Sequence, residues 1–306
     1  MKVKTLLIGS GDFAIPIFKA ALEADFLEVV GIVTQPDKPF GRDQELKGSA
    51  VFEALKTNQN ITWFKPSKFR NEYQDILTKT SPQLVLVASY GQILPKEFIE
   101  YPRHKALNFH GSILPQLRGA VPVPMAILQG LTETGVTLQV MSEGMDEGDV
   151  VSIAICDLNG TETTQSLMQN LAELGVVMLQ NELPKYLSSE LHPTPQDHSK
   201  VTYCYKTDIE KEKAEITFET DITLAERMIR AFYPWPIAYV MIEGKMLKIY
   251  KAKIHSKNVN SSNNLQIRRD GKSLLLELSS GTLELLEVQL EGKKRDNAKN
   301  YLFLAN

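Results

Sequence analysis

The sequence is poor in the residues that would build a disulfide framework or a membrane anchor. Among 306 residues it has two cysteines, Cys156 and Cys204, and neither lies in a CxxC or CxxH pattern. This spacing supports neither a disulfide framework nor a zinc site, so we expect no metal. No apolar run approaches the roughly 20 residues that a membrane-spanning helix needs, and Gly9 and Asp12 come too early for a signal peptide. These absences favour a globular, cytoplasmic protein that does not enter a membrane.

Strong charge of one sign is lacking as well, because the whole chain carries a formal net charge of -3. The charge is unevenly spread: residues 1–205 have a net charge of -6, and residues 206–306 have a net charge of +3. An excess of Lys and Arg favours a surface that meets a polyanion. A solvated basic face would give the same count, so charge alone leaves both interpretations open.

Short apolar runs rich in β-branched residues alternate with helical segments in the first half of the chain. Residues 3–8, Leu27–Val33 and Leu84–Ala88 have the composition of buried strands, and residues 13–22 have the apolar spacing of a helix. This alternation predicts an α/β unit with a parallel sheet and crossover helices. The glycine turn at residues 9–11 lacks the third glycine of a dinucleotide-binding fingerprint, so we do not expect NAD there.

The character of the sequence changes near residue 190. Residues 190–205 are polar and contain two prolines, which is typical of a linker. Beyond them, short apolar segments separated by glycine turns predict a small β-barrel, with one helix over residues 224–231. We therefore expect domains at residues 1–189 and 206–306, joined by that linker. The expected barrel strands are residues 214–218, 238–242, 247–252, 264–267, 273–278 and 282–288.

Residues 35–49 form a polar stretch with two prolines and two glycines and without an apolar period. They are predicted to form a long surface loop. Loops of this length are uncommon in compact domains unless they act on a ligand, so this segment is a candidate for gripping a substrate. A passive insert is the alternative.

An amide and an imidazole lie two residues apart in residues 106–110, where the sequence ALNFH alternates like a strand. In a strand, Asn108 and His110 point to the same side. Such a pair can bind an oxyanion, since the amide donates a hydrogen bond and a protonated imidazole donates one and carries positive charge.

A carboxylate is the usual partner for such an imidazole, and the glycine-flanked acidic loop at residues 144–149 contains one in Asp146. Taken alone, such a loop is mostly a simple turn or a cation site. The sequence has no Ser/His/Asp elbow or Cys/His nucleophile pattern, which favours direct transfer without a covalent enzyme intermediate.

These residues belong to a longer segment that resembles a known family. Residues 107–150, LNFHGSILPQLRGAVPVPMAILQGLTETGVTLQVMSEGMDEGDV, are similar to the core shared by methionyl-tRNA formyltransferases, glycinamide ribonucleotide transformylases and sugar-nucleotide N-formyltransferases. Residues 34–42, TQPDKPFGR, resemble the insertion loop of the first of these groups, and residues 230–239, 244–252 and 289–294 resemble its C-terminal barrel. The resemblance covers nearly the whole chain. It implies an α/β, Rossmann-like parallel-sheet formyltransferase domain followed by a small, OB-like C-terminal β-barrel.

The resemblance also implies the roles of particular residues. Asn108, His110 and Asp146 fall on the family's catalytic Asn, His and Asp, and residues 87–95, VASYGQILP, look like the segment that meets the pterin of 10-formyltetrahydrofolate. The residues implied to bind this co-substrate are Val87, Ala88, Tyr90, Gln92, Ile93, Leu94, Ser112, Leu114 and Pro115. Those implied to bind tRNA are Lys38, Arg42, Lys47, Lys245 and Lys248.

The implied reaction transfers the formyl group of 10-formyltetrahydrofolate to the α-amine of methionine on charged initiator tRNA, with the enzyme acting as a monomer. Asn108 and His110 hold the oxyanion in this scheme, while Asp146 keeps His110 charged and helps a proton pass to N10. The chain departs from the family pattern at residues 43–45, Asp-Gln-Glu in place of a basic run, and at Glu147, where Thr is frequent. A sugar-nucleotide formyltransferase, and a folate- or RNA-binding protein without catalysis, are the alternatives.

Overall fold

The computed structural model shows a chain that divides, by its internal contacts, into two compact units. The residues that it describes are 1–40, 44–58, 60–258 and 264–305. Unit 1 consists of Met1–Ala120, Glu133–Asp157 and Met168–Tyr203. Unit 2 consists of Val121–Thr132, Leu158–Leu167 and Cys204–Asn306. Within the described ranges, no helix combines the length and the apolar character that crossing a membrane requires.

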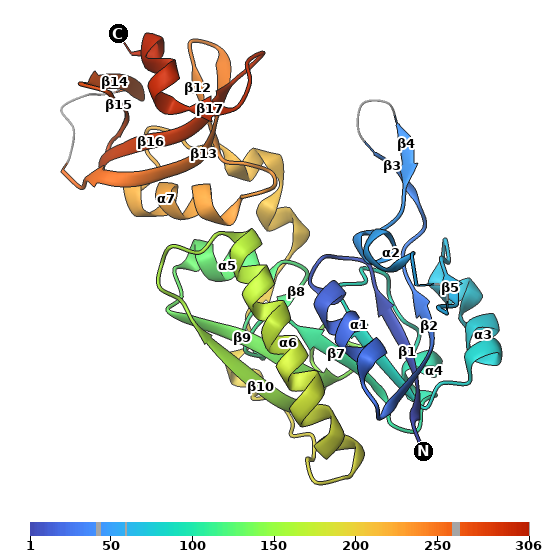
Figure 1. Cartoon of the computed structure of the whole chain (residues 1–306). Coiled ribbons are helices and arrows are strands. Elements are labelled where there is room, and N and C mark those ends of the chain that lie inside the picture. Colours follow the sequence, from blue (N-terminus) through green and yellow to red (C-terminus); the bar gives the residue numbers. More distant parts are fainter. Residues whose placement is uncertain (41–43, 59, 259–263, 306) are drawn as a thin grey trace. The chain divides into compact units, whose positions relative to one another are not determined.

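Unit 1 is built on a seven-stranded sheet, shown in blue to green in Figure 1. Its strands are β1 (Val3–Gly9), β2 (Leu27–Val33), β5 (Trp63–Phe64), β6 (Leu84–Ala88), β7 (Ala106–His110), β9 (Glu133–Val140) and β10 (Val150–Asp157). The strand order is β10-β9-β7-β6-β1-β2-β5. Strands β1, β2, β5, β6 and β7 are mutually parallel, which confirms the α/β prediction. At one edge of the sheet, β9 pairs antiparallel with β7, and β10 pairs antiparallel with β9. Periodicity finds strands and does not give their direction, so the sequence missed this change.

Helices cover both faces of this sheet. On one face, α3 (Phe69–Thr80) and α4 (Lys96–Glu100) bury an apolar cluster together with alternate residues of β1 and β6. On the other face lie α1 (Ala14–Glu23) and α6 (Thr164–Leu187). Gly175 of α6 lies so close to α1 that an added Cβ would be 2.6 Å from Cδ1 of Ile17. The shorter elements of unit 1 are α2 (Ala50–Leu55), β8 (Arg118–Gly119) and the 3-10 turn η1 (His198–Lys200).

The segment at residues 35–49 differs from the expected loop. It contains a small hairpin of β3 (Lys38–Phe40) and β4 (Glu45–Lys47), paired antiparallel. Strands of three residues are too short to show an alternating apolar pattern, which is why the sequence gives no sign of them. The prediction of a segment without regular structure was therefore wrong.

Unit 2 contains a curled antiparallel sheet packed on α7 (Ile222–Ala231), which is consistent with the OB-like domain expected from the sequence. Its strands are β12 (Tyr239–Ile242), β13 (Lys245–Ser256), β14 (Gln266–Asp270), β15 (Ser273–Leu278), β16 (Gly281–Leu290) and β17 (Asp296–Asn297). The order is β12-β13-β16-β15-β14, and β17 pairs with β16. Unit 2 also includes α5 (Pro122–Gln129), η2 (Lys206–Ile209), η3 (Lys211–Ala214) and η4 (Ala298–Leu304).

Four of the six expected barrel segments are confirmed as strands, the one at residues 264–267 overlaps β14 only at its last two residues, and the one at residues 214–218 is wrong. There, η3 ends at Ala214 and Glu215 makes only an isolated bridge to Tyr239. The chain then turns, because the N–H of Thr217 bonds the Thr220 side chain just before α7 begins. The predicted linker runs into β11 (Tyr203–Cys204), and its residues up to Tyr203 belong to unit 1. The boundaries at 189 and 206 stay a prediction.

Candidate active site

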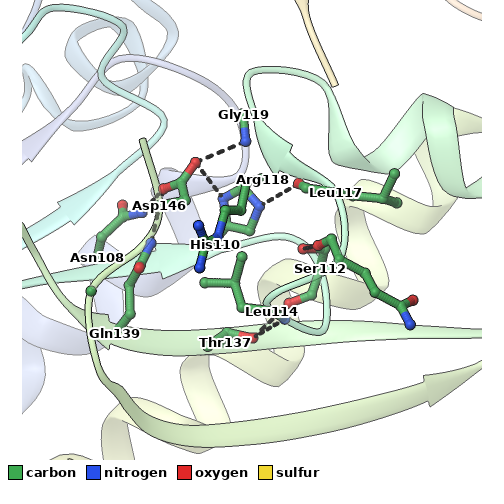
Figure 2. Close-up of polar contacts among 12 residues, drawn as sticks. Asn108, His110, Ser112, Leu114, Leu117, Arg118, Gly119, Thr137, Gln139 and Asp146 are labelled. Atoms are coloured by element: carbon green, nitrogen blue, oxygen red, sulfur yellow. Dashed lines mark hydrogen bonds and ion pairs between the residues drawn. The ribbon is translucent and has the colours of Figure 1, made fainter. Parts of the chain in front are cut away.

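The candidate site is built first on β7, which carries Asn108 and His110 at its carboxyl end. β7 pairs with β6 on one side and with β9 on the other, so Asn108 lies opposite both Val87 and Gln139. Because side chains alternate along a strand, Asn108 and His110 emerge on the same side of the sheet. Figure 2 shows both of them beside Asp146, which comes from the loop between β9 and β10.

The polar groups of the site meet at the carboxylate of Asp146. Its Oδ1 accepts hydrogen bonds from Nε2 of Gln139 at 2.8 Å and from Nδ2 of Asn108 at 3.3 Å. Its Oδ2 accepts from the backbone N–H of Gly119 at 2.9 Å and lies 3.5 Å from Nδ1 of His110. Four nitrogen atoms therefore surround one carboxylate, and the structure brings the three predicted catalytic residues together.

Both ring nitrogens of His110 face oxygen acceptors. Nδ1 faces the Asp146 carboxylate, and Nε2 lies 2.9 Å from the carbonyl oxygen of Leu117. An imidazole that carries both protons donates one hydrogen bond to each, while a neutral ring donates only one. The side chain is 6% exposed, so water has little access to either nitrogen. Each ring nitrogen of His110 thus has an oxygen atom of the protein within 3.5 Å.

The backbone of Asp146 adopts a left-handed conformation, with φ of 51°. This conformation costs on the order of 1 kcal/mol for a residue other than glycine, so neighbouring contacts must hold it. The side chain of Gln196 supplies two of them, since its Nε2 donates to the carbonyl of Asp146 at 2.9 Å and of Gly148 at 2.6 Å. The carboxylate is therefore presented by a constrained loop.

The sequence did not single out several of these contributors. Gln139 is 1% exposed, but its strand, ETGVTLQV, mixes polar and apolar residues, so no pattern in the sequence marks this amide as buried. Gln196 lies in a polar stretch that resembles a linker, and no pattern marks it. The backbone groups of Leu117 and Gly119 have no sequence signature, because every residue other than proline carries the same N–H and carbonyl.

The residues predicted to bind folate flank the catalytic pair on both sides. Val87 and Ala88 end β6 directly beside Asn108. The others follow β6 or β7. They are buried, except for half-buried Gln92 and Pro115 and for Ile93, which is 80% exposed. Hydrogen bonds within unit 1 orient three of them. The N–H of Phe69 donates to Gln92, and the Ser112 hydroxyl donates to the carbonyl of Gln116. The N–H of Leu114 donates to the hydroxyl of Thr137.

Two further features of the described residues bear on what the site could bind. Burial raises the pKa of the Tyr90 hydroxyl above its ordinary value, and that hydroxyl has no hydrogen-bond partner in the described part of the chain. No three His, Cys, Asp or Glu side chains there come together as a metal site requires.

The residues predicted to bind tRNA lie on two pieces of β structure. Lys38 and Lys47 are opposite each other in the β3–β4 hairpin, and both are exposed. Lys245 and Lys248 belong to β13 of unit 2. Arg42 lies outside the described residues.

Comparison with known proteins gives two family matches that together span most of the chain. Residues 1–183 match the family described as formyl transferase, and residues 208–304 match the formyl transferase C-terminal domain. A methionyl-tRNA formyltransferase of Myxococcus xanthus is 37% identical, over 98% of this chain and 94% of its own length. The enzyme of that name from Bacillus cytotoxicus is 34% identical, over 98% of this chain and 95% of its own length. The chain belongs to the methionyl-tRNA formyltransferase family.

Solved structures of lower sequence identity share the fold. HypX from Aquifex aeolicus, determined in complex with tetrahydrofolic acid, has a TM-score of 0.66 at 16% identity over 99% of this chain and 47% of its own. An N-formyltransferase from Helicobacter canadensis, determined with folinic acid and dTDP-3-aminofucose, has a TM-score of 0.68 at 18% identity. That match covers 92% of this chain and 98% of the other. The two-part architecture is thus shared beyond the close relatives.

Proposed function

We propose that the chain transfers the formyl group of 10-formyltetrahydrofolate to the α-amine of methionine on charged initiator tRNA. The observation that carries this proposal is the Asp146 carboxylate, ringed by Asn108, Gln139, Gly119 and His110 at the carboxyl end of β7. Membership of the methionyl-tRNA formyltransferase family supports the same substrates. We place the reaction in the cytoplasm and expect a monomeric enzyme.

The chemistry follows from the donors and acceptors of the site. The amine attacks the formyl carbon, a new C–N bond forms, and the formyl oxygen becomes an oxyanion. The Asn108 amide has two N–H donors and gives one to Asp146, so the second can bind the oxyanion. His110 adds positive charge beside it, and its Nε2–H is a further donor if it leaves the Leu117 carbonyl.

A proton must also move, because the attacking amine loses one and N10 of the folate gains one when the C–N10 bond breaks. Asp146 is the carboxylate in reach of this path and contacts both Asn108 and His110. It can accept the proton from the amine and return it to the leaving nitrogen, while the positive charge of His110 stabilises the oxyanion. No covalent bond to the protein is needed.

The surroundings of Asn108 have the chemistry that folate binding requires. The predicted folate segments, residues 87–94 and 112–115, leave the sheet at β6 and β7, so both begin next to the catalytic pair. Exposed Ile93 offers apolar area to a flat ring, and the backbone groups of these two segments offer polar partners. This chemistry of apolar surface with a few polar groups is what a pterin needs.

Binding of tRNA is proposed for the exposed Lys38 and Lys47 of the β3–β4 hairpin, and for the exposed Lys245 and half-buried Lys248 of β13. Residues 206–306 carry a net charge of +3, which favours contact with phosphates. A solvated face with a purely structural role is the alternative. A sugar-nucleotide acceptor is the second candidate function, favoured by the shared fold with the Helicobacter canadensis enzyme alone.

The test is formyl transfer to methionyl initiator tRNA, run beside an amino-sugar nucleotide. We expect activity on the charged tRNA, and a loss of about 10²–10³ in kcat for Asn108→Ala and His110→Ala with the fold retained. Turnover like that of the wild type in either variant contradicts the assignment of the site. Activity on the sugar nucleotide alone would keep the chemistry and replace the substrate.

A further inference from the structure

Arg118 is a charged side chain in the interior of unit 1. It is 1% exposed, and it is the largest fully buried side chain among the described residues. Burying a guanidinium is costly unless its donors are paired, so a buried arginine indicates a specific arrangement around it. Arg118 stands between Leu117 and Gly119, the two residues whose backbone groups bond His110 and Asp146.

The guanidinium contacts two side chains: its Nη1 lies 4.0 Å from Oε2 of Glu147, and its other nitrogens bind Gln196. Its Nε and Nη2 donate to Oε1 of Gln196 at 3.1 and 2.7 Å, a forked contact to a single oxygen. The Nε2 of Gln196 donates to the carbonyls of Asp146 and Gly148. The amide therefore uses both of its ends, and its direction is determined, because oxygen must face the arginine and nitrogen must face the two carbonyls.

The same segment is tied to the chain near Gln196 by its backbone. The N–H of Arg118 donates to the carbonyl of Thr202 at 2.9 Å, and the N–H of Leu117 donates to Oγ1 of Thr202 at 2.8 Å. Three stretches of unit 1, at residues 117–119, 146–148 and 196–202, are thus linked around one guanidinium–amide pair. Two of them touch the catalytic residues directly.

We propose that Arg118 and Gln196 are positioning residues for formyl transfer. The pair acts through the backbone of Asp146, which it keeps in its left-handed conformation with the carboxylate turned toward Asn108 and His110. It acts also through residues 117–119, whose carbonyl and N–H orient the imidazole and the carboxylate. This inference rests on the function proposed above, and neither side chain contacts the substrates in it.

The experiment compares kcat and KM in Gln196→Leu, Gln196→Glu and Arg118→Lys. Gln196→Leu removes every hydrogen bond of the amide. Gln196→Glu keeps an acceptor for Arg118 but places a carboxylate oxygen next to the carbonyl oxygens of Asp146 and Gly148, where it repels them. Arg118→Lys keeps the positive charge but cannot donate the two hydrogen bonds that the guanidinium gives to Oε1 of Gln196. We expect kcat to fall by about 10–100-fold in each, because small misplacements of a reacting group have effects of that size, and both KM values to stay within about 3-fold.

Gln83→Leu is the control, because it makes the same change at an exposed glutamine of unit 1. The amide oxygen of Gln83 accepts a hydrogen bond from the backbone N–H of Lys4 at the amino end of the strands, away from the site. We expect wild-type kcat for it. Melting curves and circular dichroism identify a variant that has not folded, and since the three test variants perturb different atoms, any one that folds decides the question.

A double variant separates positioning from a general loss of stability. If Gln196 acts through the Asp146 carboxylate, then adding Gln196→Leu to Asp146→Asn lowers single-turnover rates by less than about 3-fold. The inference is overturned by an undiminished kcat in any of the three test variants that folds, or by an equal loss on adding Gln196→Leu in both backgrounds. Wild-type rates in Asp146→Asn itself would instead refute the proposed function, and the inference with it.

Discussion

Asp146→Asn is the most direct test of the site, because it keeps the shape of the side chain and removes one acceptor oxygen. The two carboxylate oxygens serve different donors: Oδ1 takes Asn108 and Gln139, and Oδ2 takes Gly119 and His110. An asparagine has one oxygen and one amide nitrogen, so in either orientation two donors face another donor.

The magnitude follows from that count. A buried donor left unpaired costs about 1–3 kcal/mol, so two of them cost about 2–6 kcal/mol. The Asp146 side chain is 18% exposed, and water can compensate in part, so we take a value near 3 kcal/mol. If the transition state bears this loss in full, kcat falls by about 10²-fold, since 1.36 kcal/mol corresponds to a factor of ten.

The assay is single-turnover formyl transfer to methionyl initiator tRNA, with KM measured for both substrates. Asp149→Asn is the control, because it makes the same change three positions along the loop at an exposed side chain. We expect the control to match the wild type. A kcat for Asp146→Asn within about fivefold of the wild type would refute the reasoning, because it would mean that the carboxylate's paired acceptors do not matter to the reaction.

Three further measurements follow from the structure. An added Cβ at Gly9 would lie 2.5 Å from a carbonyl oxygen of β6, so Gly9→Ala should lower the free energy of unfolding in urea by about 1–3 kcal/mol, and a loss below about 0.5 would contradict this packing. Burial acts to raise the pKa of Glu277, but hydrogen bonds from Gln266 and Arg268 prevail and the pKa lies below its ordinary value of 4.5. The stability that this lowered pKa provides is present above pH 4.5 and lost as the pH falls through the folded-state value, so Glu277→Gln should destabilise the protein more at pH 7 than near pH 3; an equal effect would argue against it. Binding of methionyl initiator tRNA should weaken with salt, and Lys248→Ala should reduce the slope of log affinity against log salt by about 0.9, whereas an unchanged slope would remove Lys248 from the interface.

The periodic elements of this protein could be predicted because their signals are local. β2, β6 and β15 have the bounds expected from their apolar runs, and α1 and α7 begin within two residues of the expected positions. The failures share one cause. The β3–β4 hairpin and the turn at residues 214–218 are decided by pairing and by side-chain bonds such as Thr217 to Thr220, which leave no period in the sequence.

The candidate site divides in the same way. By itself, the sequence determined that Asn108 and His110 share one face of a strand, because side chains alternate with a period of two along any strand. Only the tertiary structure decided that β9 pairs beside β7, which sets Gln139 opposite Asn108, and that the Asp146 carboxylate meets both. The first contact depends on the register between β7 and β9, and the second depends on the left-handed backbone of Asp146, which Gln196 holds. The spacing of residues along the chain encodes neither the register nor this backbone conformation.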